Sequence, residues 1–216
     1  MAETCRLCGG ENTAHFFTGT RRSQSRDFLR CSDCDMVFVP ERFLVSEADE
    51  RERYLTHHND PHDEGYRRFL SRLVDELAPL LRPGASGLDF GCGPGPALAL
   101  MLRERGHPMQ IYDPFFEPDP APLHGTYEFI TCTETMEHFR RPMDEFQRLN
   151  RMLKRPGLLG IMTGMLEDWS QFPEWHYHTD VTHICFYSRD TMEWIAGRFG
   201  WECRIPREGV VLFETA

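Results

Sequence analysis

The segment from Leu88 to Arg105 constrains the fold of this chain more than any other part of the sequence. Leu88-Asp89-Phe90 is a short apolar strand, and the glycine-rich run Gly91-Cys92-Gly93-Pro94-Gly95 follows it directly. A helical pattern then begins at Ala97 and stops at Gly106. A strand, a glycine turn and a helix in this order favour a polar or anionic ligand, because the glycine backbone allows close approach and the helix N-terminus presents free N–H groups. We therefore expect an α/β fold with a cofactor at this turn.

The spacing of the glycines separates two cofactor classes. Gly91, Gly93 and Gly95 form G-x-G-x-G, whereas the dinucleotide fingerprint G-x-G-x-x-G has its third glycine one position later. This offset disfavours an NAD-dependent dehydrogenase. The next apolar strand, over residues 109–112, ends at Asp113, where a carboxylate can accept hydrogen bonds from both hydroxyls of a ribose.

Together these segments resemble class I S-adenosylmethionine (SAM)-dependent methyltransferases. Residues 89–95 match the first motif of that family, acid-x-G-x-G-x-G, and residues 128–138 resemble its fourth strand with the Glu-His turn that follows. The resemblance implies a Rossmann-like sheet that is mostly parallel with an antiparallel last strand, and it implies SAM as the cofactor. The residues that the resemblance places at the cofactor are Asp89, Gly91, Cys92, Gly93, Gly95, Asp113, Pro114, Thr133 and Glu134.

The remaining periodicity supplies the other elements of such a sheet. In chain order it predicts a helix over 66–81, a helix over 143–153 that is stopped by Pro156-Gly157, a strand over 158–164, a helix capped by Ser188, and a hairpin of strands 201–205 and 210–215. Together with the glycine turn, these elements cover nearly all of residues 63–216.

The region for a third strand is too short for the usual helix and strand. Only residues 114–127 separate the second strand from the next one, and they contain four prolines, which interrupt regular structure. We expect a short or missing third strand, so the adenine-flanking loop of the family has no counterpart. Phe115 and Phe116 either provide a stacking surface for adenine or serve as buried anchors of a turn.

Two C-x-x-C pairs near the N-terminus predict a metal site. The four residues are Cys5, Cys8, Cys31 and Cys34. Gly9 and Asp35 follow the two pairs, and both residue types tolerate the positive φ that such a tight turn requires. If the intervening residues form a hairpin, the four thiolates converge on a tetrahedral Zn²⁺ site of the zinc-ribbon type. Because four protein ligands leave no open position, we expect a structural zinc. The remaining cysteines, at positions 92, 132, 185 and 203, are expected to be core thiols.

The length of 216 residues allows one α/β domain and a small additional segment. We expect a zinc-ribbon-like segment at 1–40, a polar linker or lid at 41–62 and a SAM-binding methyltransferase domain at 63–216. On the lid, Tyr54, His57 and Asn59 are candidates to close over the methionine end of the cofactor.

Charge and hydropathy restrict partners and location. The formal net charge is −10, which repels a phosphate backbone and makes nucleic acid an unfavourable partner. The sequence has no apolar run of the roughly 18 residues that a membrane span needs, and residues 1–10 lack the apolar core of a signal peptide. We therefore expect a cytoplasmic protein with a small-molecule substrate and no membrane contact.

The stretch from Trp175 to His183 follows the fifth expected strand and is dense in histidine and aromatic residues. It resembles a Trp-x-Tyr…Asp-x-Thr-His loop of methyltransferases with an N-terminal cysteine cluster, several of which modify nucleotide-linked sugars. We expect this loop to face the acceptor, with His183 as general base, Asp180 as the residue that orients it, and His138 as the second candidate base. A structural role is the alternative for each histidine. The pair His176-x-His178 lacks a clear third ligand and is not expected to bind a metal.

The expected function is SAM-dependent methyl transfer to a small molecule such as a sugar or nucleotide-sugar, by direct displacement with optional proton removal by histidine. One alternative is an RNA methyltransferase whose zinc ribbon contacts RNA, since Arg21, Arg22 and Arg26 lie in the expected hairpin loop. A catalytically silent binding module with a SAM fold is the other.

Overall fold

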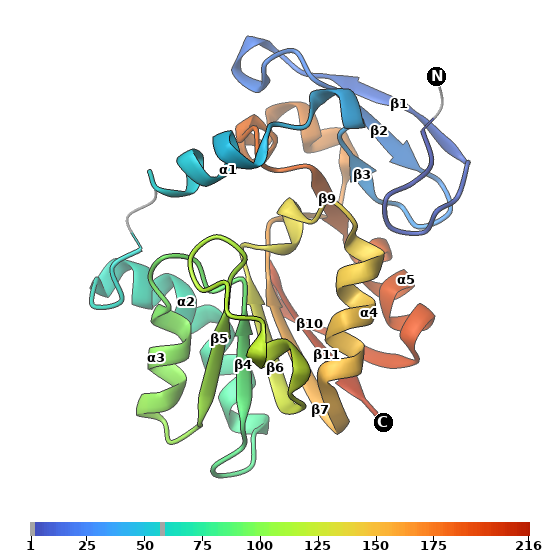
Figure 1. Cartoon of the computed structure of the whole chain (residues 1–216). Coiled ribbons are helices and arrows are strands. Elements are labelled where there is room, and N and C mark those ends of the chain that lie inside the picture. The colour runs from blue at the N-terminus through green and yellow to red at the C-terminus, as the bar shows by residue number, and fades with distance from the viewer. Residues whose placement is uncertain (1–2, 57–58) are drawn as a thin grey trace.

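The computed structural model describes residues 3–56 and 59–216 and contains two β-sheets, one above the other (Figure 1). His57, expected on the lid, lies outside the described residues. The helices are α1 (Glu47–Tyr54), α2 (Glu64–Leu77), α3 (Ala97–Glu104), α4 (Pro142–Met152) and α5 (Arg189–Phe199). None of the helices in these ranges is long and apolar enough to cross a membrane.

The lower sheet has six strands and the topology expected from the sequence. Its strands are β4 (Gly87–Phe90), β5 (Met109–Tyr112), β6 (Tyr127–Thr133), β7 (Leu153–Met162), β10 (Trp201–Arg207) and β11 (Val210–Thr215). Their spatial order is β10-β11-β7-β6-β4-β5. Neighbouring strands from β5 to β7 are parallel, whereas β11 is antiparallel to both β7 and β10. The prediction of an α/β, Rossmann-like sheet with an antiparallel last strand is confirmed.

The shortened third-strand region is also confirmed. Asp113 and Glu117 exchange backbone hydrogen bonds of 3.1 Å and close a tight turn, and the short 3-10 helix η4 (Ala121–His124) follows. The described residues between β5 and β6 therefore form no strand, and β5 is an edge of the sheet.

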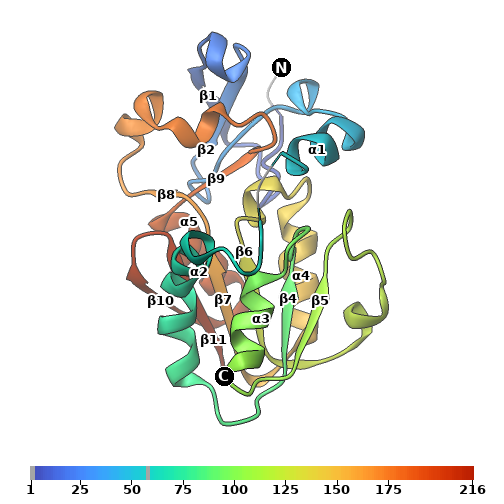
Figure 2. The same ribbon diagram turned by 90° about the vertical axis from the view of Figure 1, so that its left-hand side faces the viewer.

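Side chains that alternate along the strands build two separate cores. Leu158 and Met162 of β7 face one core, whereas Leu159 and Ile161 face the other, as the period of two in a strand requires. Helices α2 and α3 cover the first face and α4 and α5 the second, and they lie to the left and right of the sheet in Figure 1. Figure 2 views α2 and α3 from the front. Burial on both faces explains the continuous apolar runs of these strands.

One expected boundary is wrong. Strand β7 begins at Leu153, so Pro156-Gly157 lies inside the strand instead of ending the preceding helix, which already stops at Met152. The pairing of β6 with β7 is irregular between Tyr127 and Phe129, and such an irregularity lets a proline enter a strand without donating a ladder hydrogen bond.

The upper sheet joins the N-terminal strands to residues 165–188. Its strands are β1 (Thr13–Thr18), β2 (Asp27–Cys31), β3 (Val37–Phe38), β9 (Cys185–Ser188) and β8 (Met165–Leu166), in that spatial order. The expected hairpin is β1–β2, and β3 pairs with β9 through Val37–Phe186 and Phe38–Cys185. Hydrogen bonds thus connect the segment 1–40 with the loop region between β7 and α5.

Aromatic side chains fill the space beside this sheet. The Phe28 ring is fully buried, and its centroid lies 5.1 Å from that of Phe172, 5.5 Å from that of His178 and 5.6 Å from that of Phe186. A phenylalanine of the N-terminal hairpin therefore packs against residues that lie far away in the sequence. Such packing contributes to stability through buried area and ring geometry.

We expect Phe28→Ala to lower the free energy of unfolding by about 3–5 kcal/mol, because it removes a buried ring and leaves a cavity. Phe69→Ala is the matched control, since Phe69 on α2 is exposed, and it should cost less than about 1 kcal/mol. Urea unfolding monitored by fluorescence measures both values. A change in Phe28→Ala as small as that in the control would contradict the packing described for the upper sheet.

Candidate functional site

The candidate site lies where the carboxyl ends of four parallel strands meet. The glycine turn follows β4, Asp113 follows β5, the segment from Glu134 to His138 follows β6, and Thr163 follows β7. The loops of the upper sheet and α1 lie above this edge (Figure 1). Ligands of open α/β sheets bind at such an edge.

The glycine turn requires glycine for two different reasons. Gly91 and Gly93 have φ of 78° and 63°, a region that side chains disfavour. A Cβ added at Gly91 would overlap Thr135, and one added at Gly95 would overlap the backbone oxygen of Asn59. The segment that carries Asn59 therefore packs directly on the turn.

Asp113 is buried and connects the second strand to the glycine turn. Its Oδ2 accepts a hydrogen bond of 3.0 Å from the Gly93 N–H, and its Oδ1 accepts bonds of 2.8 and 3.1 Å from the N–H groups of Phe115 and Phe116. The carboxylate is thus held beside the turn, next to Pro114. Oδ1 already accepts two hydrogen bonds, whereas Oδ2 accepts one and can accept a second, so a ribose hydroxyl remains a compatible partner at Oδ2.

Asp89 lies beneath the turn, with only 2% of its surface exposed. It accepts a hydrogen bond of 2.8 Å from Thr131 Oγ1. Burial raises the pKa of Asp89 to about 6. The thiol of Cys92, within the turn, is likewise buried, and burial raises its pKa. Both residues are placed to support the backbone of the turn.

Phe115 and Phe116 are both half-buried in the turn after β5. The Phe115 ring lies 5.6 Å from the ring of Tyr54 on α1, and the guanidinium of Arg51 lies 5.9 Å from the Phe116 ring. The two rings therefore face α1 beside the turn.

After β6, Thr133 and Glu134 lead into the short 3-10 helix η5 (Met136–His138). Glu134 has φ of 48° and donates its N–H to Met162 O at 2.7 Å, while its side chain is exposed. This left-handed residue turns the chain at the end of the strand, and its Oε2 lies 3.4 Å from Tyr177 Oη.

A group of three polar side chains that the sequence analysis did not select lies beside this turn. Glu137 is fully buried; its Oε1 accepts a bond of 2.5 Å from Tyr177 Oη and its Oε2 a bond of 2.9 Å from Thr163 Oγ1. Burial, followed by the Glu137 charge, raises the pKa of Tyr177 far above its ordinary value, so its hydroxyl stays protonated. The sequence signals for this group were the Glu-His pair after β6 and the tyrosine of the Trp-x-Tyr motif, whereas Thr163 had none.

His138 and His183 lie together at the centre of the site, with ring centroids 4.9 Å apart. Nδ1 of His183 lies 2.8 Å from the backbone oxygen of Tyr177, and Nδ1 of His138 lies 2.9 Å from that of Thr182. Because a carbonyl only accepts, each Nδ1 carries the hydrogen, and Nε2 of a ring in the neutral form is then an acceptor. Burial, and secondarily the nearby His138, lowers the pKa of His183 to about 4, so this imidazole is neutral at pH 7.

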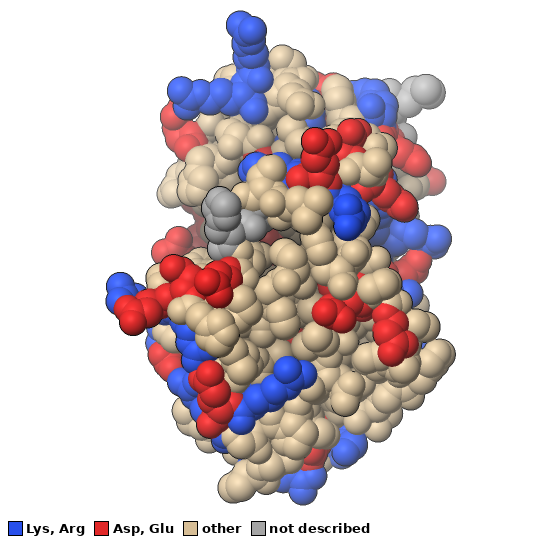
Figure 3. Space-filling view, turned by 60° about the vertical axis from the view of Figure 1, so that its left-hand side comes forward, with Lys and Arg blue, Asp and Glu red and all other residues tan. Residues whose placement is uncertain are grey.

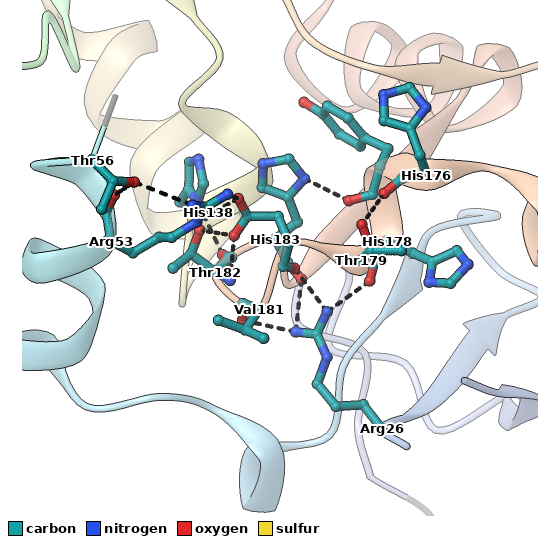
Figure 4. A network of polar contacts seen from close by, with 12 residues as sticks. Arg26, Arg53, Thr56, His138, His176, His178, Thr179, Val181, Thr182 and His183 are labelled. Atoms are coloured by element: carbon teal, nitrogen blue, oxygen red, sulfur yellow. Dashed lines mark hydrogen bonds and ion pairs between the residues drawn. The ribbon is translucent and has the colours of Figure 1, made fainter. Parts of the chain in front are cut away.

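The expected role of Asp180 as the residue that orients His183 is wrong, because the Tyr177 carbonyl occupies that position. Asp180 instead accepts bonds of 3.0 and 2.7 Å from the N–H and Oγ1 of Thr182, and one of 2.7 Å from Arg53 Nη2 (Figure 4). Its carboxylate therefore stabilises the loop and ties it to α1.

A second part of α1 also reaches the histidines. The ring of Tyr54 lies 5.1 Å from the ring of His138, and its hydroxyl donates to Glu50 Oε1 at 2.6 Å. Glu50 in turn pairs with Arg140 at 3.1 Å. Residues of the expected lid thus lie between the glycine-turn side and the histidine side of the site.

Two groups of the described residues bring metal-ligand atoms within 4.8 Å of one another: the four N-terminal cysteines, and Glu137 with His138 and His183. In the second group both Glu137 carboxylate oxygens accept hydrogen bonds and both Nδ1 atoms face backbone carbonyls, which leaves the two Nε2 atoms as the available acceptors. His176 and His178 belong to neither group. His178 is buried and stacks on Phe172 with centroids 5.0 Å apart.

The cysteine cluster has the geometry of a zinc site. The Sγ atoms of Cys5 and Cys34 lie 3.5 Å apart, and those of Cys8 and Cys31 also lie 3.5 Å apart. Tetrahedral coordination with Zn–S bonds of about 2.3 Å places sulfurs roughly 3.8 Å apart, so the four thiols fit the ion. The expected positive φ angles occur, at 72° for Gly9 and 62° for Asp35.

The other cysteines lie apart from this cluster. Cys132 and Cys185 are fully buried and Cys92 is buried in the glycine turn, whereas Cys203 is half-buried. The first three are core thiols as expected, and Cys203 lies at the margin of the core.

The sheet order, the glycine turn and the acid at the end of β5 define the class I SAM-dependent methyltransferases. A family model described as a methyltransferase domain matches residues 62–204, and the chain belongs to this family of methyltransferases. The protein is therefore an enzyme that uses SAM.

Solved structures share the fold at low sequence identity. A 1,6-didemethyltoxoflavin-N1-methyltransferase from Burkholderia thailandensis has 15% identity and a TM-score of 0.54, covering 86% of this chain and 97% of that chain. A magnesium protoporphyrin IX methyltransferase from Synechocystis PCC 6803 with bound SAH has 14% identity and a TM-score of 0.52, covering 79% and 95%. No curated protein sequence matches the chain.

Proposed function

We propose that this methyltransferase acts on a small-molecule acceptor, such as a sugar or nucleotide-sugar, bound between the glycine turn and the two histidines. The observation that carries the proposal is the neutral His183, whose ring lies beside that of His138 after β6 and whose Nε2 has no hydrogen-bond partner among the described residues. The two similar structures named above are also of enzymes named for small-molecule acceptors.

SAM supplies an electrophilic methyl group when bound. The glycine turn would hold its polar end, Asp113 its ribose, and Thr133 with Glu134 would border its methionine end. Methyl transfer is a direct displacement, so the residues around it mainly align the acceptor and exclude water. An oxygen or carbon acceptor also loses a proton, which His183 Nε2 would accept, with His138 as the alternative base.

Two observations disfavour the RNA methyltransferase. Of the three arginines in the hairpin loop, Arg26 is buried with 1% exposed surface and faces the protein interior, while Arg21 and Arg22 are exposed. Figure 3 shows acidic and basic side chains interspersed over the face that it displays. With a net charge of −10, this arrangement attracts a phosphate backbone weakly. The family match disfavours the silent binding module.

The first experiment tests the cofactor site. We expect Asp113→Ala to weaken SAM binding by about 1–3 kcal/mol, because hydrogen bonds from the ribose to a charged acceptor are lost. Asp113→Asn, which keeps the shape of the turn, should lose less. Calorimetry measures both, with the exposed Asp119→Ala as control. Unchanged SAM affinity in Asp113→Ala would contradict the proposal that Asp113 binds the ribose of SAM.

The second experiment tests the metal. Protein purified without chelator should contain about one zinc per chain, because the four thiols form a closed tetrahedral set. Cys34→Ser should lose the zinc and lower the unfolding temperature, whereas Cys203→Ser, outside the cluster, should retain it. Elemental analysis and thermal unfolding measure these outcomes. Wild-type protein without zinc would contradict the assignment.

The third experiment tests the reaction. With methyl-labelled SAM, label should enter nucleotide-linked sugars or other small acceptors and not RNA. His183→Ala should slow transfer by about 100-fold or more with SAM affinity within about twofold, while His176→Ala, at an exposed position of the same loop, should leave the rate unchanged.

The pH dependence gives an independent check on His183. Because its pKa is about 4 and the base must be neutral, its protonation should reduce the rate only near and below pH 4, not near pH 6.5. A limb near pH 6.5 that disappears in His138→Ala would move the base to His138. In the labelling experiment above, transfer of the methyl label to RNA would contradict the proposed small-molecule acceptor.

A further inference from the structure

Arg26 is a buried cation at the junction of the N-terminal hairpin and the loop of residues 175–183. Only 1% of its surface is exposed. It follows Gln24 and Ser25, which have φ of 56° and 52°, and it immediately precedes β2. This strained loop directs the side chain inward from the hairpin, as Figure 4 shows.

The guanidinium donates only to backbone carbonyls. Its bonds go to Ser23 O at 3.3 Å from Nε, to Val181 O at 2.8 Å and His183 O at 3.3 Å from Nη1, and to His178 O at 2.8 Å and Asp180 O at 2.8 Å from Nη2. An arginine has five N–H donors, so every donor has a partner. Burial lowers the pKa of Arg26 to about 10, so the group remains charged at neutral pH.

The conformation of residues 178–183 depends on this cation. Four carbonyl oxygens of the segment point toward one site, and such aligned dipoles repel one another unless a positive charge lies between them. From the opposite side, Arg53 of α1 binds the Asp180 carboxylate (Figure 4). The backbone that carries His183 is therefore held by one arginine on its carbonyls and by another through a side chain.

The cysteine cluster anchors the same region at a second point. Asp35, next to Cys34, accepts hydrogen bonds of 2.8 Å from Trp169 Nε1 and 2.5 Å from Ser188 Oγ. Trp169 begins the 3-10 helix η6 (Trp169–Glu174), and Ser188 ends β9. The N-terminal segment thus contacts the loop region near its start, at its centre and at its end.

We propose that Arg26 is a positioning residue, through which the N-terminal cysteine-bearing segment sets the backbone of residues 178–183 and so places the His183 imidazole at the methyl-transfer site. The inference rests on the proposed function for the importance of His183, but the placement itself can be measured without an acceptor. The matched pair of variants is Arg26→Lys and Arg22→Lys, since Arg22 is exposed in the same hairpin. Lysine keeps the charge and loses the planar fork that reaches several carbonyls.

The readout is the imidazole of His183 in the full-length, zinc-loaded protein labelled with ¹⁵N-histidine. In wild-type protein, Nδ1 should carry the hydrogen and the ring should remain neutral well below pH 6.5. Nuclear magnetic resonance of the ring nitrogens reports both properties. In Arg26→Lys, the hydrogen bond from His183 Nδ1 to Tyr177 O should weaken and both tautomers of His183 should appear. The midpoint of the His183 titration should move toward pH 6.5. The groups that face His183 are His138, Glu137, Asp180 and Tyr177, and none of them is altered.

Three further measurements separate positioning from general damage. Zinc content and SAM affinity of Arg26→Lys should stay within about twofold of wild type, while kcat with an acceptor falls about 10-fold or more and Arg22→Lys stays unchanged. Wild-type His183 titration and kcat in Arg26→Lys would overturn the proposal. If His183→Ala retained activity, the base assignment would fail while the nuclear magnetic resonance result still tested the positioning.

A measurement on wild-type protein does not depend on the folding of any variant. The guanidinium hydrogens of Arg26 should exchange slowly with solvent and show hydrogen-bond couplings to the carbonyls of His178, Asp180 and Val181, whereas those of Arg22 should exchange rapidly. Fast exchange at Arg26, equal to that at Arg22, would overturn the proposal.

Discussion

The arrangement of the candidate site depends on one buried cation. Removing the Arg26 guanidinium from water is costly unless each N–H finds an acceptor, and five backbone carbonyls meet that requirement. The N-terminal hairpin and the loop of residues 175–183 must therefore pack against each other, and β3 extends this contact by pairing with β9. A segment of about forty residues is too small to bury a core of its own, so this packing explains its stability together with the cysteine cluster.

Much of the fold could be predicted because its signals are local. The glycine spacing at 91, 93 and 95 and the acid at Asp113 identify the cofactor edge without any tertiary information. Four prolines in residues 114–127 exclude a third strand for steric reasons. The two C-x-x-C pairs predict the cluster because two intervening residues let both thiols face one ion.

The parts that could not be predicted depend on contacts between the backbone and distant side chains. Strand β3 has only two residues, and nothing in its sequence indicates that β9 is its partner. Asp180 was a reasonable orienting residue from its distance to His183 along the chain, but a backbone carbonyl at Tyr177 occupies that position, and carbonyls carry no sequence signal. Pro156 ends helices in general, yet a local irregularity in pairing accommodates it in β7.

The same contacts that hold the loop also determine the charge state of its histidine. Withdrawal from water lowers the pKa of an imidazole, and a loop withdrawn from water needs partners for its own polar groups. Arg26 satisfies four carbonyls of that loop from below, and Tyr177 O accepts the Nδ1 hydrogen of His183. Without the cation, those carbonyls would need water beside them, and water there would favour the charged imidazole. Through Arg26, the N-terminal hairpin can therefore influence the charge state of His183.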